Sequence, residues 1–492
     1  MALPLTGFHL DARAGGTLQQ QVQETVASGI LEGRFRPGDR MPSSRELAKH
    51  LGVSRITITL AYTELVSAGY LTSRARSGYF VSETAPDASV ASPETANGDG
   101  VDWSRVIRRR YSGETLVDKP ADWHAYPYPF LYGQADKTLF DHTNWRRCAM
   151  RALGRRDLAP ATEDLFERDD PVLIEYIVRH ILARRGIAAR QEDVLITLGA
   201  QNALWLIVEI LLAGRRTVAI ENPIYPGLRA ILNSTASSLI PVDVDDEGLP
   251  PEKVPAETDV VFVTPSHHSP TTATMPLHRR RALLDRAEAE DFVIVEDDYE
   301  FEIAAAAAPS RALKSLDRDG RVIYVGSFSK SIFPGLRLGY IVASPPFLRE
   351  ARALRTLVLR HPPGQLQRTA AYFLSLGHYD ALVKRMDAHY RRRREAMREA
   401  FHRNGLRVAS EAMGGGSSFW MRAPDGIDTG ALAQRLKEDG VLVDPGAPFF
   451  ADPSDGVGYY RLAYSSIRTE DIEPGVALIA RAIAGMEREP PR

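Results

Sequence analysis

The apolar positions near the start of the chain follow helical spacing. An apolar residue recurs every fourth position after a possible cap at Thr17, at Leu18, Val22, Val26 and Ile30. This spacing predicts a first helix with one apolar face. Pro37 and Gly38 then break the chain before the next element.

Two shorter helices and a hairpin are predicted next. Ser43-Ser44-Arg45-Glu46 is a capping-box pattern that opens a short helix stopped at Gly52. Ser54 caps a third helix, which ends at Gly69 and carries inward Leu60, Ala61 and Leu65. A hairpin follows from Tyr70 to Val81, with its turn near Ser77-Gly78. The predicted order is helix, helix, short turn, helix and a two-stranded wing.

A different pattern begins at about residue 120, where apolar runs alternate with helical stretches. The runs are Val194 to Thr197, Thr217 to Ile220, Val260 to Val263, Phe292 to Val295, and Val322 to Val325. Such continuous Val/Ile runs suit a mostly parallel sheet that is buried on both faces. The last part, from about 365 to 488, mixes charged helices with short strands such as Ser418 to Arg422 and Tyr460 to Ala463. It predicts a smaller α+β subdomain.

The two patterned regions are separated by a stretch poor in large apolar residues. From Glu83 to about Gly100 the chain is mainly Ala, Ser, Pro, Thr, Asp and Gly, a composition that buries too little surface to order itself. We therefore predict a first domain over residues 12–83, a linker over 84–120 and a second domain over 121–488. The predicted fold class is α/β, with a helical head.

The charge balance gives no global preference for nucleic acid. The 492 residues carry a formal net charge of -2. The first 82 residues contain nine Arg or Lys and six Asp or Glu, a local net charge of +3. Any DNA-binding charge must therefore be concentrated in the first domain.

Cysteine content and hydropathy point to the cytoplasm. Cys148 is the only cysteine, which excludes a disulfide framework and a cysteine metal cluster. No run of about 18 apolar residues occurs, and the first residues do not resemble an export signal. We expect no membrane segment and no metal site.

Several polar side chains of the first domain suit contact with DNA. In a helix-turn-helix the second helix of the motif enters the major groove with its first turn, which here holds Ser54, Arg55 and Thr57. The other candidates are Arg45 on the preceding helix and, on the wing, Arg74, Arg76 and Gly78. Arginine is favoured because its planar fork pairs with guanine edges or phosphate oxygens.

The run PGDRMPSSRELAKHLGVSRITITLAYTELVSAGYLTSRARSGYFV resembles the winged helix-turn-helix of the GntR family of bacterial repressors and activators. The resemblance covers about 65 residues and implies binding to double-stranded DNA. One departure is Ile56, where relatives with an aminotransferase-like domain often have Asn. The base preference at that position is therefore left open.

The second domain offers a lysine beside phosphate donors. Lys330 follows a predicted strand in Gly-Ser-Phe-Ser-Lys, and the nearby donors are Ser327, Ser329 and Arg337. Another strand ends in Glu296-Asp297-Asp298-Tyr299, where open α/β sheets bind ligands. Asp297 is our candidate partner for a pyridinium nitrogen, and Tyr299 would donate to a ring hydroxyl oxygen.

Two further segments complete this set. Ala200 and Gln201 begin a helix whose N-terminal amides suit a phosphate. Tyr225 offers an aromatic ring that could stack against a pyridine ring. A Schiff-base lysine, a carboxylate for the pyridine nitrogen and several phosphate donors are what pyridoxal phosphate requires. The ordered set predicts that cofactor.

Residues 125 to 485 resemble the fold-type I aminotransferases, and with its head the chain is similar to the MocR subgroup of GntR regulators. The resemblance implies that Lys330 forms the internal aldimine, Asp297 contacts the ring nitrogen, Tyr299 the phenol oxygen and Arg337 the phosphate. Tyr225 takes the ring-stacking position. Arg461, in Tyr-Tyr-Arg-Leu-Ala-Tyr, matches the arginine that holds a substrate carboxylate.

Two segments depart from the aminotransferase pattern or extend it. Ser269-Pro270-Thr271-Thr272 stands where aminotransferases commonly have Asn-Pro-Thr-Gly, so the asparagine contact is missing and His267 or His268 is a possible substitute. The segment from Phe130 to Asp136 resembles one at the dimer interface, which implies that Tyr132 and Gly133 face the partner's active site.

Three functions are compatible with these patterns. The favoured one is a homodimeric, DNA-binding regulator that reads paired half-sites and senses an amine or amino acid through an external aldimine at Lys330. The alternatives are a working aminotransferase with an appended head, and a degenerate scaffold that binds no cofactor. The effector stays open among an ectoine-derived diaminobutyrate, γ-aminobutyrate, taurine and vitamin B6. Arg461 argues for a carboxylate.

Overall fold

The computed structural model divides the chain into two compact units, Met1–Tyr111 and Ser112–Arg492, which are treated separately below. The described residues are 3–10, 16–74, 77–85, 101–108, 110–112, 119–133, 136–158, 162–301, 311–410 and 416–488. The predicted linker spans 84–120, and its residues 86–100, 109 and 113–118 lie outside the described residues. A short helix, α4 (Trp103–Val106), falls within it.

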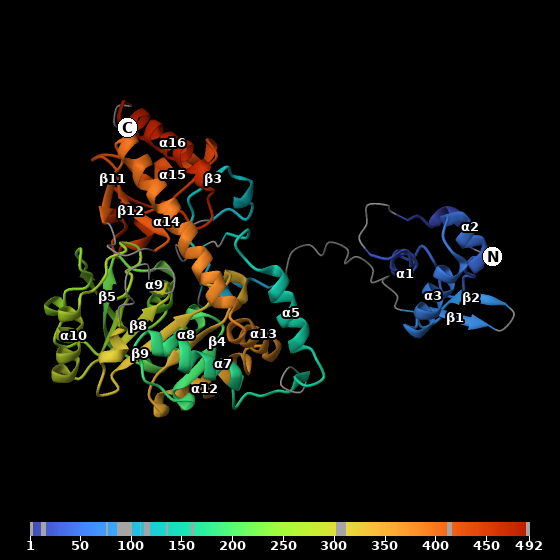
Figure 1. Cartoon of the computed structure of the whole chain (residues 1–492), viewed down its shortest axis with the longest axis horizontal. Coiled ribbons are helices and arrows are strands. Elements are labelled where there is room, and N and C mark those ends of the chain that lie inside the picture. Colours follow the sequence, from blue (N-terminus) through green and yellow to red (C-terminus); the bar gives the residue numbers. More distant parts are fainter. Residues whose placement is uncertain are drawn as a thin grey trace. The chain divides into compact units, whose positions relative to one another are not determined.

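The first unit has the predicted winged helix-turn-helix. Its elements are α1 (Leu18–Leu31), α2 (Ser44–Leu51), α3 (Arg55–Ser67) and the antiparallel pair β1 (Leu71–Arg74) and β2 (Gly78–Val81) (Figure 1). Both α1 and α2 begin with a complete capping box, formed by Thr17 with Gln20 and by Ser43 with Glu46. The left-handed Gly52 (φ 67°) ends α2 and allows the sharp turn into α3.

A small apolar core holds these elements together. Val22, Val26 and Ile30 of α1 are buried with Ala61 and Leu65 of α3, as predicted. The predictions for Leu18 and Leu60 were wrong, since these side chains are 51% and 48% exposed. Their positions continue the apolar spacing, but Leu18 lies in the first turn of its helix and Leu60 on the outer face of α3.

The second unit is built on a seven-stranded sheet in the order β4-β10-β9-β8-β7-β5-β6. All strands run parallel except β10, which is antiparallel to both neighbours. The strands are β4 (Val194–Thr197), β5 (Thr217–Asn222), β6 (Ser238–Asp243), β7 (Val260–Val263), β8 (Val293–Asp298), β9 (Val322–Ser327) and β10 (Gly339–Val342). The five predicted strands and the mostly parallel sheet are therefore confirmed.

Helices cover both faces of this sheet, which explains the continuous apolar runs. Along β9, Ile323 and Val325 pack in one cluster with α8 (Ala200–Leu211), α9 (Pro226–Asn233) and α12 (Pro345–Leu359). Val322 and Tyr324 point to the opposite face. That face is covered by α7 (Pro171–Tyr176), which continues as a π-helical turn over Ile177–Leu182, and by α10 (Leu277–Glu290) and α13 (Gly364–Ser375).

A smaller sheet follows in the order β11-β12-β15-β14. Its strands are β11 (Arg407–Ser410), β12 (Ser418–Arg422), β14 (Asp444–Pro445) and β15 (Tyr459–Ala463), and α15 (Thr429–Glu438) and α16 (Thr469–Arg488) pack beside it. The pair β3 (Tyr128–Pro129) and β13 (Val441–Leu442) joins an early segment to this part. The predicted subdomain start near residue 365 falls on α13, which packs against α5 (His142–Ala152) and α7.

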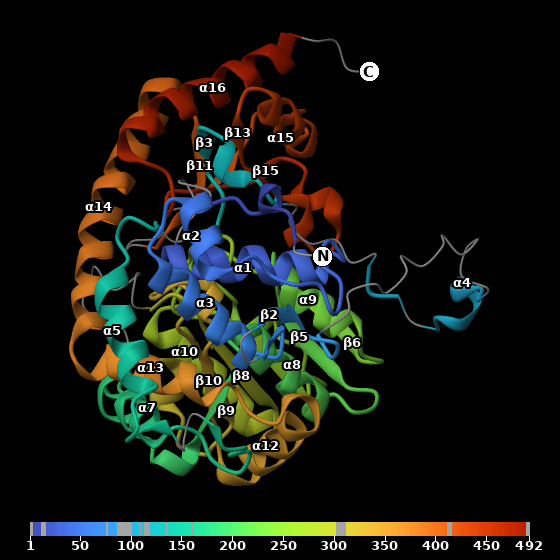
Figure 2. The same cartoon turned by 90° about the vertical axis from the view of Figure 1, so that its right-hand side faces the viewer.

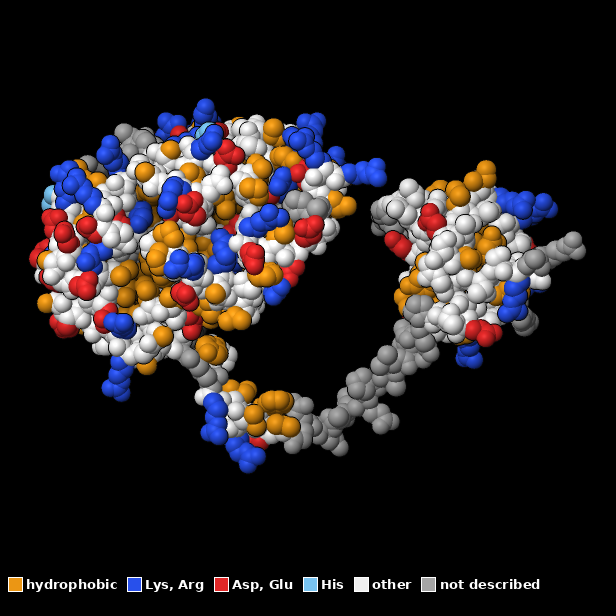
Figure 3. Space-filling view, turned by 90° about the horizontal axis from the view of Figure 1, so that it is seen from below, with side chains coloured by type: hydrophobic (Ala, Val, Ile, Leu, Met, Phe, Trp, Pro, Cys, Tyr) orange, Lys and Arg blue, Asp and Glu red, His pale blue; other side chains and the backbone are white. Residues whose placement is uncertain are grey.

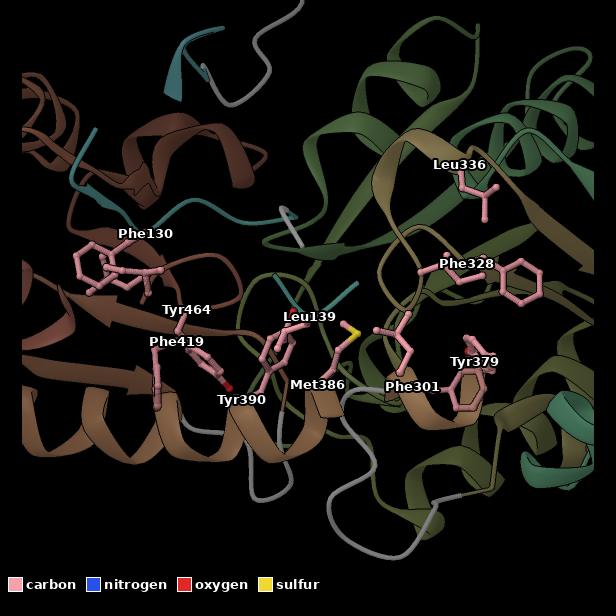
Figure 4. Packing of buried hydrophobic residues seen from close by; sticks show 14 of the residues in the cluster. Phe130, Leu139, Phe301, Phe328, Leu336, Tyr379, Met386, Tyr390, Phe419 and Tyr464 are labelled. Atoms are coloured by element: carbon pink, nitrogen blue, oxygen red, sulfur yellow. The ribbon is translucent and has the colours of Figure 1, made fainter. Parts of the chain in front are cut away.

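The long helix α14 (His378–Asn404) connects the two parts of this unit, running from α13 to α16 (Figure 2). Its Met386 and Tyr390 pack in a cluster that extends from Phe328 and Tyr379 to Phe419 (Figure 4). One apolar cluster therefore runs through both parts of this unit.

Charged side chains of both signs are interspersed over the visible face of the second unit (Figure 3), in keeping with the net charge of -2. Among the described residues, every helix is too short or too polar to cross a bilayer. The described residues also hold no cluster of His, Cys, Asp and Glu with metal-binding geometry. Cys148 is free and buried.

Candidate functional site

A cavity of about 410 Å³ lies at the carboxyl ends of the parallel strands. Every side chain that the sequence nominated for cofactor or effector binding lines it: Ala200, Gln201, Tyr225, Asp297, Tyr299, Ser327, Ser329, Lys330, Arg337 and Arg461. These residues span some 260 positions of the chain. Parallel strands bring their carboxyl ends to one sheet edge, which gathers most of them, whereas Arg461 comes from β15 of the smaller sheet.

The acidic run at the end of β8 is divided between the two sides of the sheet. Glu296 accepts hydrogen bonds from the backbone N–H groups of Leu313 and Lys314, both 2.8 Å long. Asp298 forms a buried ion pair with Arg185 at 2.8 Å. Only Asp297 of this run faces the cavity, because successive side chains of a strand point to opposite sides.

Asp297 is prepared for a cationic or proton-donating partner. It is buried, and its Oδ1 atom has no hydrogen-bond partner among the described residues. Burial, and then the nearby charge of Asp298, raise the pKa of Asp297 to about 7, while Lys330 opposes the rise. A buried carboxylate oxygen without a partner fits a protonated pyridine nitrogen.

One end of the cavity collects donors for an anion. Gly199 (φ 80°) precedes α8, so the first backbone amides of that helix and its positive dipole end point into the cavity. A Cβ at Gly199 would lie 3.2 Å from Nη2 of Arg337, which places the guanidinium against the helix start. The Ser329 hydroxyl is buried without a partner among the described residues. This donor set fits a phosphate group.

Lys330 lies between this end and the opposite one. Its Nζ is 4.3 Å from the ring centroid of Tyr132, and a Cβ at Gly133 would lie 2.5 Å from the same atom. Burial lowers the pKa of Lys330 to about 8, against the opposing charge of Glu300. A larger fraction of neutral amine is therefore present near pH 7 than for an ordinary lysine, and a neutral amine is what a Schiff base requires.

Tyr132 and Gly133 line the cavity of their own chain, and the expectation that they face a partner's active site stays a prediction. The Tyr132 ring lies against two cations, with Lys330 Nζ at 4.3 Å and Arg461 Cζ at 4.1 Å from its centroid.

Arg461 is already engaged within the chain. Its Nε and Nη2 atoms donate to Oδ2 of Asp444 at 3.0 and 2.8 Å, and both side chains are buried. The two residues face each other across β14 and β15. The sequence nominated Arg461 but gave no signal for Asp444, because nothing local links residues 17 positions apart on two short strands.

Neither histidine of the His267-His268 pair is among the cavity-lining residues, so the idea that one replaces the missing asparagine finds no support in this geometry. His267 lies 3.3 Å from Glu300, and His268 lies 3.4 Å from Glu221 on β5. Ser269 lines the cavity instead. The sequence also missed Lys119 and Thr264 as lining residues, since neither belongs to a recognisable motif.

In the first unit, the DNA-binding candidates gather where α2 and α3 begin. Arg45 and Arg55 are exposed, and Nε of Arg55 donates to the Ser44 hydroxyl at 3.3 Å. Ser54 acts as the cap of α3, with its hydroxyl bonded to the N–H and the hydroxyl of Thr57 at 3.1 and 2.9 Å. Two arginines beside two helix N-termini form a suitable surface for phosphate or base contact.

The wing supplies the remaining candidates. Arg74 lies with its Cζ 4.6 Å from the Phe80 ring centroid, and Gly78 adopts φ 98° at the start of β2. Arg76 lies outside the described residues. Ile56, the departure from the related sequences, is 71% exposed in the first turn of α3.

Replacement of Arg55 with alanine is expected to weaken specific DNA binding by about 1 to 3 kcal/mol if the side chain reads a base. If it contacts phosphate, the slope of log K against log salt should fall by about one instead. Titration of labelled operator DNA at several salt concentrations distinguishes the two. Arg34, which is exposed and paired with Glu32, provides the control substitution, Arg34→Ala. An Arg55→Ala variant with unchanged affinity and salt slope would contradict both roles.

Comparisons with known proteins agree with this two-part architecture. The model of the gntR family of bacterial regulatory proteins matches residues 18–81, and that of class I and II aminotransferases matches residues 147–479. The chain is 31% identical, over 78% of its length and 77% of the relative's, to the probable rhizopine catabolism regulatory protein MocR of Rhizobium meliloti.

The chain belongs to the MocR-type GntR regulators. A MocR-type chain with these two domains is a transcription regulator with a DNA-binding head. The chain is also 56% identical to the HTH-type transcriptional regulator TauR of Rhodobacter capsulatus, over 98% of this chain and all of the relative.

The aminotransferase-like part of this MocR-type chain resembles solved aminotransferase structures. One is LysN, the α-aminoadipate aminotransferase of Thermus thermophilus, complexed with N-(5'-phosphopyridoxyl)-L-leucine. Its TM-score is 0.71 at 28% identity, covering 79% of this chain and 99% of LysN. The fold is therefore that of the pyridoxal-phosphate-dependent aminotransferases.

Proposed function

We propose that this regulator binds pyridoxal phosphate at Lys330 and senses a small amine or amino acid, whose binding changes the affinity of the head for DNA. The observation that carries the proposal is the single cavity in which Lys330, the unpartnered Asp297 oxygen and the phosphate donors lie together. Bound at Lys330, the cofactor supplies an electrophilic imine carbon that an incoming amine can attack.

In this proposal the effector amine replaces Lys330 on that carbon. The effector nitrogen would take over the imine bond as an external aldimine, and Lys330 would be released as a free amine. The effector ammonium gives up its proton before it attacks, and Lys330, with a pKa of about 8, can accept one on leaving. Release of Lys330 from its covalent bond would be the signal within the domain.

A second candidate is a working aminotransferase with an appended head. It is favoured because the cavity retains Lys330, Asp297 and Arg461. We call the part of the cavity around Arg461, where an effector would bind, the effector end. Sensing without turnover remains our preference because the asparagine of the aminotransferase pattern is absent and Ser269 lines the cavity in its place.

Operator reading is proposed to require a homodimer. Winged helix-turn-helix heads commonly read two half-sites, and a two-fold symmetric protein matches a palindromic operator. The proposed partners are double-stranded DNA with paired half-sites, a second copy of the chain and the small effector.

A visible absorption titration of the cofactor-loaded protein with amines and amino acids tests the proposal, followed by mass analysis of the cofactor. A sensor should give a persistent spectral change with the cofactor recovered as pyridoxal phosphate. Recovery of pyridoxamine phosphate with release of an oxo acid would establish the enzyme instead. A colourless protein that takes up no cofactor would overturn both.

A further inference from the structure

The effector end of the cavity holds three charged side chains. Arg461 and Asp444 form a buried ion pair there, and Lys119 lines the same cavity. Lys119 is joined by no salt bridge to a carboxylate of the described residues, and the charge of Asp444 acts on it electrostatically. The end therefore carries two cations and one anion, a net charge of +1.

The guanidinium of Arg461 donates hydrogen bonds to Asp444 through two of its three nitrogen atoms. Its Nε and Nη2 atoms both donate to one oxygen of Asp444, Oδ2. The same oxygen also accepts a hydrogen bond from the Tyr132 backbone N–H at 3.4 Å. None of the described residues accepts a hydrogen bond from Nη1. An arginine has two edges that can each receive an oxyanion, so the Nη1 edge stays available to a ligand.

Glu300, another acid near the effector end, does not reach the cavity. Glu300 accepts hydrogen bonds from the hydroxyls of Tyr132 and Ser417 and lies 3.3 Å from His267. It is buried and does not line the cavity. Asp444 is therefore the carboxylate that a ligand meets at the effector end, and Asp297 lies at the ring position.

On these observations we propose that the effector is an amino compound with one anionic group, received jointly by Lys119 and the free edge of Arg461, and that Asp444 excludes ligands with two. The inference rests on the proposed sensing of an amine at Lys330. A single carboxylate or sulfonate brings the end to two cations and two anions. A second carboxylate would meet Asp444 in a partly dehydrated site, and a diamine would add a third cation.

Isothermal titration calorimetry of the cofactor-loaded full chain tests the inference with a matched series of compounds. β-Alanine and taurine carry one amine and one anion, L-aspartate adds a carboxylate to the β-alanine skeleton, and 1,3-diaminopropane replaces the anion with an amine. β-Alanine and taurine should bind at least about tenfold tighter than L-aspartate and 1,3-diaminopropane. One uncompensated charge in a partly buried site changes the binding free energy by at least that factor.

Two substitutions assign the effect to named residues. Lys119→Gln should weaken binding of the monoanionic compounds about tenfold, and Lys119→Arg should restore it. Asp444→Asn should strengthen L-aspartate binding about tenfold relative to β-alanine, because it removes the excluding charge. Lys384→Gln, a substitution of an exposed lysine outside the cavity, is the matched control and should change nothing.

The outcomes separate this inference from the function on which it rests. Preference for the diamine or for L-aspartate, or affinities indifferent to both Lys119→Gln and Asp444→Asn, would overturn the charge arrangement and leave the sensor intact. A coloured protein that gives no heat with any amine or amino acid would remove the sensor itself.

Discussion

Lys330→Ala should abolish the visible absorption band of the cofactor-loaded protein, because Lys330 is the lysine whose charge acts on Asp297, whereas Lys119, the other lysine among the described lining residues, interacts with Asp444. Borohydride reduction of the native protein, followed by peptide mass analysis, should place the phosphopyridoxyl label on the peptide containing Lys330. The loss is expected to be complete, since a covalent bond is removed.

The same variant should separate the two functions of the chain. The head is a compact unit with its own apolar core, so Lys330→Ala should keep its DNA affinity and lose the response to effector. Lys384→Ala, at an exposed site on α14, is the control and should retain both. A label on the peptide carrying Lys119, or a band that survives in Lys330→Ala, would refute the assignment of the lysine.

Asp297→Asn is expected to lower cofactor affinity by roughly 10- to 150-fold, the value of about 1.5 to 3 kcal/mol for a hydrogen bond to a charged group. The amide keeps the size of the side chain but cannot hold a proton on a pyridine nitrogen, and it leaves no compensating charge in a buried position. Equilibrium dialysis or fluorescence titration with the cofactor gives the affinity directly. An affinity equal to that of the native protein would reject Asp297 as the ring-nitrogen partner.

The pKa of Asp297 also predicts a pH dependence of the cofactor-free protein. Burial raises this pKa from its ordinary value near 3.8 to about 7. A carboxyl whose pKa is higher in the folded than in the unfolded state stabilises the fold below the unfolded value and loses that contribution as pH rises through the folded one. Stability should therefore fall between about pH 4 and pH 7, by up to roughly 4 kcal/mol from this group.

Asp297→Asn provides the control for that dependence. Burial also raises the pKa of Glu221 to about 8 and that of Glu296 to about 7, so both contribute in the same range. The difference in unfolding free energy between variant and native protein isolates Asp297, and it should shift in favour of the variant as pH increases. Denaturant unfolding of both apo proteins between pH 4 and 8 measures it. Parallel pH profiles would show that Asp297 keeps an ordinary pKa.

Most of the head was predictable because its signals are local. A capping box needs residues three positions apart, and a helix stop needs a glycine able to adopt a left-handed conformation, as at Gly52. The two wrong burial predictions, Leu18 and Leu60, concern apolar residues at the margins of an amphipathic stripe. The spacing of apolar residues indicates which face of a helix is apolar. How many side chains of that face are buried depends on how neighbouring elements pack against it.

The parallel strands and the order of the cofactor residues were likewise readable along the chain. A strand buried on both faces must be continuously apolar, and ligand-binding residues follow the carboxyl end of such a strand. Asp297 lies at the end of one such strand, and Ser329 and Lys330 follow shortly after the next, so their convergence at one sheet edge followed from the topology of parallel strands.

The sequence by itself therefore determined the two-part architecture, the caps and strands, and the residues gathered around Lys330. Only the tertiary structure decided what surrounds Arg461. Its pairing with Asp444, the approach of Lys119 and the position of Tyr132 between two cations join segments with no shared motif. Charge balance in a cavity depends on which distant side chains the packed elements bring within a few ångströms, and no local pattern of residues encodes that distance.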